Sequence, residues 1–103
     1  MLTKQMEKLI KENTIGLVAT ITPDGYPAVS PKATTVVLDS THLAFIDLRS
    51  PKTKRNIKAN PSVELNYIDV FRRQACRIKG MATYIDRSDK KFDGMSKNFT
   101  IWS

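Results

Sequence analysis

One short segment of the chain combines the residue types that hold a phosphate group. Residues 50–56 read Ser-Pro-Lys-Thr-Lys-Arg-Asn, and a serine followed by a proline is typical of a helix start. Lys52, Lys54 and Arg55 then fall in the first turns, where the helix dipole is already positive and cations are disfavoured. An anion on the free backbone amides would reverse that penalty. The segment therefore predicts a phosphate site, and a solvated basic surface helix is the alternative.

Other kinds of chemistry have little support in the sequence. One histidine and one cysteine cannot build the usual zinc site, so no metal is expected. No serine, cysteine or lysine has a recognisable base as partner, so no catalytic residue can be named. His42 lies in a predicted turn and is interpreted as an exposed loop residue. Cys76 lies in a strand predicted to be buried and is interpreted as a reduced core thiol.

The pattern of apolar residues predicts how these residues are positioned. Residues 2–13 form an amphipathic helix with Thr3 as its cap and Asn13 as its end, and residues 51–59 form the helix that carries the basic segment. A third helix is expected over residues 89–97. The extended segments are residues 15–22, 26–38, 43–48, 63–67 and 75–85.

Turn residues refine this arrangement of strands. Pro23, Asp24 and Gly25 join the first two strands as a hairpin, and the second strand should be broken or bulged near Pro31. Gly80 suggests a second bulge, and the strand over residues 43–48 should be buried on both faces. Five strands with local connections predict a small antiparallel barrel rather than a parallel sheet.

Length and charge restrict the possible partners. A chain of 103 residues forms one domain, and its net charge of +7 favours an anionic partner. The basic residues are not interleaved with exposed aromatic residues, as a surface that binds single-stranded nucleic acid would require, so we do not expect nucleic acid as a partner. No apolar run is long enough to span a membrane and no secretory signal is visible, so we expect a cytoplasmic protein without a membrane partner.

Four segments together resemble a known family. They are Val29-Ser30-Pro31-Lys32, the strand Leu43-Ala44-Phe45-Ile46-Asp47, the helix start over residues 50–56, and Arg77-Ile78-Lys79-Gly80. Their combination, over about residues 2–96, resembles the FMN-binding split barrels related to pyridoxamine 5′-phosphate oxidase. The resemblance implies a mainly β fold, a small antiparallel split β-barrel with short helices. It also implies FMN as cofactor, a homodimer with the cofactor between subunits, and an oxidoreductase of unknown substrate.

The resemblance also assigns residues to the cofactor. It implies that Lys52, Thr53 and Asn56 receive the FMN phosphate, with Ser50 as the helix cap. The second strand would line the flavin ring with Ser30, Pro31, Lys32 and Ala33, and the third would contact the ring edge through Phe45, Ile46 and Asp47. Arg77, Arg72 and Arg73 would reach the cofactor, in one interpretation from the partner subunit, and surface charge is the alternative.

Lys32 is the residue of this set with a chemical consequence. Ser30 and Lys32 alternate with Val29 and Pro31, so the two polar side chains should project from one face of the strand. A lysine near the pyrimidine edge of the flavin would favour the anionic reduced form. The alternative is an exposed strand lysine.

Several functional alternatives remain open. The protein can be an FMN-binding electron carrier or storage protein without a substrate, or a relative that uses deazaflavin or haem. A nucleic-acid-binding small barrel is the remote alternative. Members of the family commonly continue into a further strand beyond the point where this sequence stops, at Ser103, so we expect either a minimal barrel or one without the closing strand.

Overall fold

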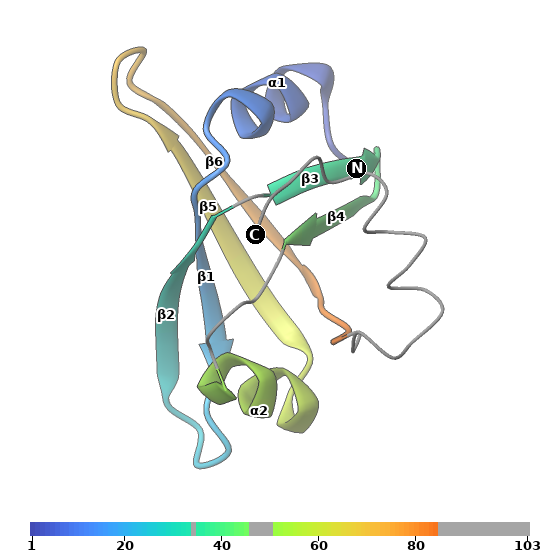
Figure 1. The fold of residues 1–103 in the computed structure, drawn as a ribbon, viewed down its shortest axis with the longest axis vertical. Helices are drawn as coiled ribbons and strands as arrows, with labels where there is room; N and C mark the ends of the chain where they lie inside the picture. The colour runs from blue at the N-terminus through green and yellow to red at the C-terminus, as the bar shows by residue number, and fades with distance from the viewer. Residues whose placement is uncertain (34, 46–50, 85–103) are drawn as a thin grey trace.

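The computed structural model describes residues 1–33, 35–45 and 51–84, without the side chain of Pro51. These residues form two helices and six strands (Figure 1). In chain order the elements are α1 (Lys4–Glu12), β1 (Gly16–Ile21), β2 (Pro27–Lys32), β3 (Thr35–Asp39), β4 (His42–Phe45), α2 (Pro51–Ala59), β5 (Ser62–Asp69) and β6 (Gln74–Met81).

The strands form two antiparallel sheets. The larger sheet has the order β2-β1-β5-β6, and β3 and β4 pair as a separate hairpin. In Figure 1 the β3–β4 hairpin lies beside one face of the larger sheet, with α1 near one end of that sheet and α2 near the other. No helix in the described ranges is long and apolar enough to cross a bilayer.

The core lies on the face of the larger sheet that carries the apolar side chains of alternate residues. Val18 of β1 pairs with Leu65 of β5, and both side chains are buried. Ile10 of α1 and Ile57 of α2 belong to the same buried cluster. We call this the inner face of the sheet and the opposite side its outer face. Strand periodicity thus decides which residues anchor the two helices.

Both helices begin or end where the sequence predicts. The Thr3 hydroxyl accepts a hydrogen bond from the Met6 amide at 3.1 Å, so Thr3 caps α1, and Asn13 ends it. The basic helix α2 ends at Ala59, directly before Asn60 and Pro61. The predicted hairpin between the first two strands is also confirmed, because all six residues of β1 pair with β2.

The predicted break in the second extended segment is confirmed. Residues 26–38 form two strands, β2 and β3, and the chain leaves the larger sheet after Lys32, close to Pro31. The interruption is a break rather than a bulge, because Pro31 itself pairs regularly with Leu17, and the sequence did not indicate that the two strands belong to different sheets. Strand β2 is an edge strand, where a residue without an amide hydrogen is tolerated.

Two further expectations about strands are corrected. Gly80 pairs in regular register with Val63, so it makes no bulge. Among the described residues, β4 pairs with β3, and Leu43, Ala44 and Phe45 are half-buried, which differs from the expected burial on both faces. The predicted helix at 89–97 lies outside the described residues.

Cys76 lies on an edge strand that is mostly exposed rather than buried, but its own side chain packs against the core. The thiol is free and half-buried, and burial raises its pKa. A raised pKa keeps the sulfur protonated and unreactive. His42 is exposed, as predicted, and its ring contacts the Asp39 carboxylate at 2.9 Å.

Candidate functional site

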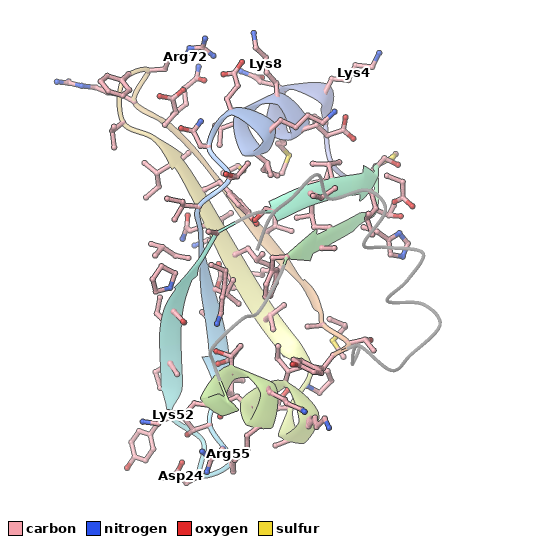
Figure 2. All side chains as sticks on the ribbon, in the orientation of Figure 1. Lys4, Lys8, Asp24, Lys52, Arg55 and Arg72 are labelled. Atoms are coloured by element: carbon pink, nitrogen blue, oxygen red, sulfur yellow. The ribbon has the colours of Figure 1, made fainter. Side chains whose placement is uncertain are left out.

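The start of α2 presents cations to solvent without an opposing carboxylate in its first turn. Lys52 and Arg55 are both exposed, and no acidic residue occupies the first turn. Figure 2 shows their side chains at the end of the molecule that also carries Asp24, in the β1–β2 turn. The Asp24 carboxylate accepts a hydrogen bond from the Thr22 hydroxyl at 2.6 Å. Exposed positive charge at the positive end of a helix dipole favours the binding of an anion.

Thr53 and Asn56 lie on the opposite, buried side of the same helix. They are only 5% and 4% exposed. The Asn56 amide Nδ2 donates a hydrogen bond to the Thr20 hydroxyl on β1 at 3.0 Å. These two side chains thus hold α2 against the sheet, while Lys52 points to solvent. A role of Thr53 and Asn56 as phosphate ligands stays a prediction.

Lys32 is buried, which contradicts the interpretation of an exposed strand lysine. Lys32 is 6% exposed, and Ser30 on the same face of β2 is half-buried. Val29 and Pro31, on the other face, are exposed. Lys32 pairs with Gly16 across the strands. The predicted alternation along β2 is confirmed. A buried ammonium group is costly, so such a position is more often functional than an exposed one.

The other predicted ring-lining residues are distributed over both faces. Pro31 lies on the outer face and Ala33 is exposed just beyond the end of β2. Phe45 is half-buried at the end of β4 and packs against the core. Ile46 and Asp47 lie outside the described residues.

Arg77 is separated from the rest of the predicted set. It lies on the outer face of β6, and its Nε atom is 2.8 Å from Glu64 Oε1. That carboxylate oxygen is buried but not aligned for a hydrogen bond, so the contact is an ion pair. Within one chain the fold therefore brings Ser30, Lys32, Thr53 and Asn56 to the inner face and leaves Arg77 on the other side of the sheet.

Two polar contacts that support this face had no signal in the sequence. The Thr20 hydroxyl accepts the hydrogen bond from Asn56. In the core, the Tyr67 hydroxyl is 2.9 Å from the Thr35 hydroxyl, and this hydrogen bond joins β5 to β3. Burial raises the pKa of Tyr67. A threonine in a strand is too common to reveal such a pairing, and only the register shows it.

The described part of the chain contains no group of three or more histidine, cysteine, aspartate or glutamate side chains that could hold a metal ion.

The described elements, a basic helix start packed on two antiparallel sheets, can be compared with known proteins. The sequence profile of the pyridoxamine 5′-phosphate oxidase family matches residues 2–102. The chain belongs to this family. A comparison with curated protein sequences gives no match.

Solved structures show the same fold. A candidate pyridoxamine 5′-phosphate oxidase from Lactobacillus delbrueckii is 29% identical, with a TM-score of 0.83 over 96% of this chain and 80% of that one. HupZ from Group A Streptococcus is 26% identical, with a TM-score of 0.82 over 94% of this chain and 76% of that one. The mainly β, antiparallel split barrel is therefore the fold of this family member.

A third solved structure is more distant. HutZ from Vibrio cholerae, described as a haem storage protein, is 19% identical, with a TM-score of 0.70 over 96% of this chain and 77% of that one. At this identity the likeness concerns the fold alone.

Proposed function

We propose that this member of the pyridoxamine 5′-phosphate oxidase family is an FMN-binding flavoprotein that acts as an oxidoreductase on an unknown substrate. The proposal rests on the start of α2. Lys52 and Arg55 are exposed there, and the first turn of the helix contains no acidic residue. When bound, the flavin supplies the hydride or electron transfer, and the protein supplies anchoring, orientation and electrostatics.

The residues present fit a phosphate at this place. The positive end of the helix dipole and two exposed cations form an anion site whose helix is fixed to β1 by the buried Asn56–Thr20 hydrogen bond. Lys52 is our proposed phosphate ligand, because its charge is solvent-accessible. Asn56 holds the helix in position, and direct contacts of Thr53 and Asn56 with the phosphate stay a prediction.

The proposed ring site uses β2. Ser30 and Lys32 share the inner face of an edge strand, and the Lys32 side chain is buried there. A positive charge beside the ring would stabilise the anionic reduced flavin and raise its reduction potential. Pro31, Ala33, Phe45, Ile46 and Asp47 stay predicted ring contacts.

We also propose a homodimer with the cofactor between the subunits. The outer face of the larger sheet exposes apolar side chains that a monomer leaves in water, among them Leu17 (39% exposed) and Val29 (65%). If a second copy covers this face, Arg77 lies at the interface. The proposed ring site at Ser30 and Lys32 lies on the inner face, so the approach of Arg77 to a cofactor on the partner stays a prediction from the family resemblance.

Haem is the competing ligand. The fold shared with HutZ supports it, and the single histidine of the chain, His42, has its Nδ1 atom beside the Asp39 carboxylate. A carboxylate at Nδ1 is the usual arrangement for an imidazole that binds a metal through Nε2. His42 is nevertheless exposed at the first residue of β4, so the arrangement gives weaker support than the basic helix start.

The absorption spectrum of the purified protein with each added ligand tests the proposal. We expect FMN to bind with quenching of its fluorescence, and hemin to give no saturable Soret shift. Saturable hemin binding that is lost in His42→Ala, together with no binding of FMN, would overturn it. Oxidation of reduced nicotinamide by the FMN-loaded protein then separates an enzyme from an electron carrier.

A further inference from the structure

The tip of the β5–β6 hairpin exposes apolar side chains at one end of the molecule. Phe71 is 96% exposed and Val70 is 71% exposed, both between the two strands. A turn of this kind is normally polar, because exposed aromatic rings gain nothing from water. The tip lies at the opposite end from the basic start of α2, so the proposed flavin site does not explain it (Figure 2).

The tip is held in a defined shape. Asp69, which is buried, accepts hydrogen bonds from the backbone amides of Phe71 and Arg72, both at 3.1 Å. These amides, that of Arg72 first, hold the pKa of Asp69 below its usual value. Arg73 has a φ of 54°, a left-handed conformation that is uncommon for arginine. A strained, fixed turn that displays a phenylalanine indicates a contact surface.

Positive charge surrounds the apolar tip. Arg72 and Arg73 follow Phe71 in the turn, and Lys4 and Lys8 project from α1 at the same end of the molecule (Figure 2). Arg72 is paired with Glu12 at 2.8 Å and lies 3.9 Å from Asp69, which leaves Glu7 as the remaining carboxylate on α1. Within the described residues, no ion pair joins Lys4, Lys8 or Arg73 to a carboxylate. The end therefore carries a net positive charge.

A hollow lies directly behind the tip. It has a volume of about 190 Å³ and is lined by Gln5, Lys8, Leu9, Asp69, Arg72 and Gln74. Two cations and two amides around it can donate hydrogen bonds to phosphate oxygens, and Asp69 is already occupied by the turn amides. This arrangement matches the layers of an anionic bilayer surface. The apolar tip suits the apolar part of the interface, and the cations and the polar hollow suit the lipid phosphates.

We propose that this end of the molecule docks on anionic lipid membranes. Phe71 and Val70 enter the interfacial layer, while Arg73, Lys8 and Lys4 contact lipid phosphates. Docking of this kind is peripheral, so it needs none of the long apolar segments on which the expectation of no membrane partner was based. Few apolar groups and a small net charge make the binding weak, reversible and sensitive to salt.

Co-sedimentation of the full chain with lipid vesicles tests the proposal. One vesicle is pure phosphatidylcholine and the other contains about one third phosphatidylserine, an anionic lipid. We expect binding to the anionic vesicles, little to the neutral ones, and release when the salt concentration rises. Equal binding to both vesicles, or binding to neither, would overturn the proposal.

Paired variants locate the contact. Phe71→Ser should weaken binding to anionic vesicles by about tenfold or more, because the largest inserted group is lost. Tyr26→Ser is the control, since it removes an aromatic side chain of 67% exposure at the other hairpin. Arg73→Gln should also weaken binding, whereas Lys79→Gln on the outer face of β6 should not. Equal effects within either pair would count against the tip.

The same variants distinguish a protein contact from a lipid contact. If Phe71→Ser changes the oligomeric state in sedimentation experiments without vesicles, the tip is a contact between subunits and the proposal is wrong. FMN affinity is measured in parallel. Loss of vesicle binding with normal FMN binding concerns this proposal alone, because the tip and α2 lie at opposite ends.

Discussion

Gly16 is the residue whose replacement the fold restricts most severely. A Cβ atom at this position would lie 2.6 Å from Cε1 and 2.8 Å from Cζ of Tyr67. The tyrosine ring cannot move aside easily, because it is completely buried and its hydroxyl is bonded to Thr35. The absence of a side chain at Gly16 thus permits the close packing of β1 on β5.

Gly16→Ala should therefore lower the free energy of unfolding by about 1–3 kcal/mol, the usual cost of overpacking a core. Gly80→Ala is the matched control, because Gly80 is also in a strand and a Cβ there meets no atom within 4 Å. Urea denaturation of both variants measures the difference. If the two midpoints shift equally, the tight contact with Tyr67 does not exist.

Asp39 gives the fold an acid-sensitive contact at the β3–β4 turn. Hydrogen bonds from the Thr41 amide and then from the His42 ring lower its pKa from 3.8 to about 2. A lowered pKa in the folded state stabilises the fold above the unfolded value, and that contribution disappears as the pH falls from about 4 toward about 2.

Asp39→Asn should flatten this part of the stability curve. Thermal unfolding between pH 2 and pH 5 should show a smaller decrease of Tm with acid in the variant than in the parent chain. The group is exposed, so the expected change is small. An unchanged slope would show that the turn hydrogen bonds do not form in solution.

At the scale of elements, α2 depends on its hydrogen bond to β1. Asn56 and Thr20 are both buried, and each leaves an unsatisfied partner if the other is removed. Thr20→Val and Asn56→Ala should each lower the free energy of unfolding by about 1–3 kcal/mol, and the double variant should lose less than the sum. Additive losses would mean that the two side chains do not interact.

How far the sequence predicts these elements depends on what defines each one. Thr3, Asn13 and the Ser50-Pro51 pair are local signals, and the helices begin and end near them. Pro31 signalled a break within residues 26–38, but not that the second part joins another sheet, because Thr35, Val36 and Val37 favour a strand just as Val29 does. Which sheet a strand joins depends on long-range packing, and no local signal marks it.

The candidate site was predictable to a similar degree. Alternation along β2 correctly placed Ser30 and Lys32 on one face, since strand geometry fixes it. Helical periodicity did not reveal that Thr53 and Asn56 face the sheet, because both are polar residues in a basic segment. Thr20, the partner of Asn56, is 36 positions away in the sequence, so only the fold brings the two side chains together.

At the scale of the whole molecule, the outer face of the larger sheet is the proposed contact with a second copy. Val29→Glu places a charge among the exposed apolar residues of this face, and a twofold axis would bring in two such charges. The dimer should weaken by about 100-fold or more in analytical ultracentrifugation. Tyr26→Glu, of similar exposure in the β1–β2 turn, should leave the dimer intact; a monomeric parent chain would contradict the proposal.

The central claim is that the start of α2 holds the phosphate of FMN, and Lys52→Ala tests it most directly. The variant removes one charge-assisted contact worth about 1.5–3 kcal/mol, so FMN should bind about one to two orders of magnitude more weakly. Lys58→Ala, at the far end of the same helix, is the matched control and should change FMN binding little. Riboflavin has the same ring without the phosphate, so its weaker binding should hardly change in Lys52→Ala. A fluorescence titration with both ligands measures all these affinities. If Lys52→Ala weakens riboflavin as much as FMN, or weakens neither, the phosphate is not bound at the start of α2.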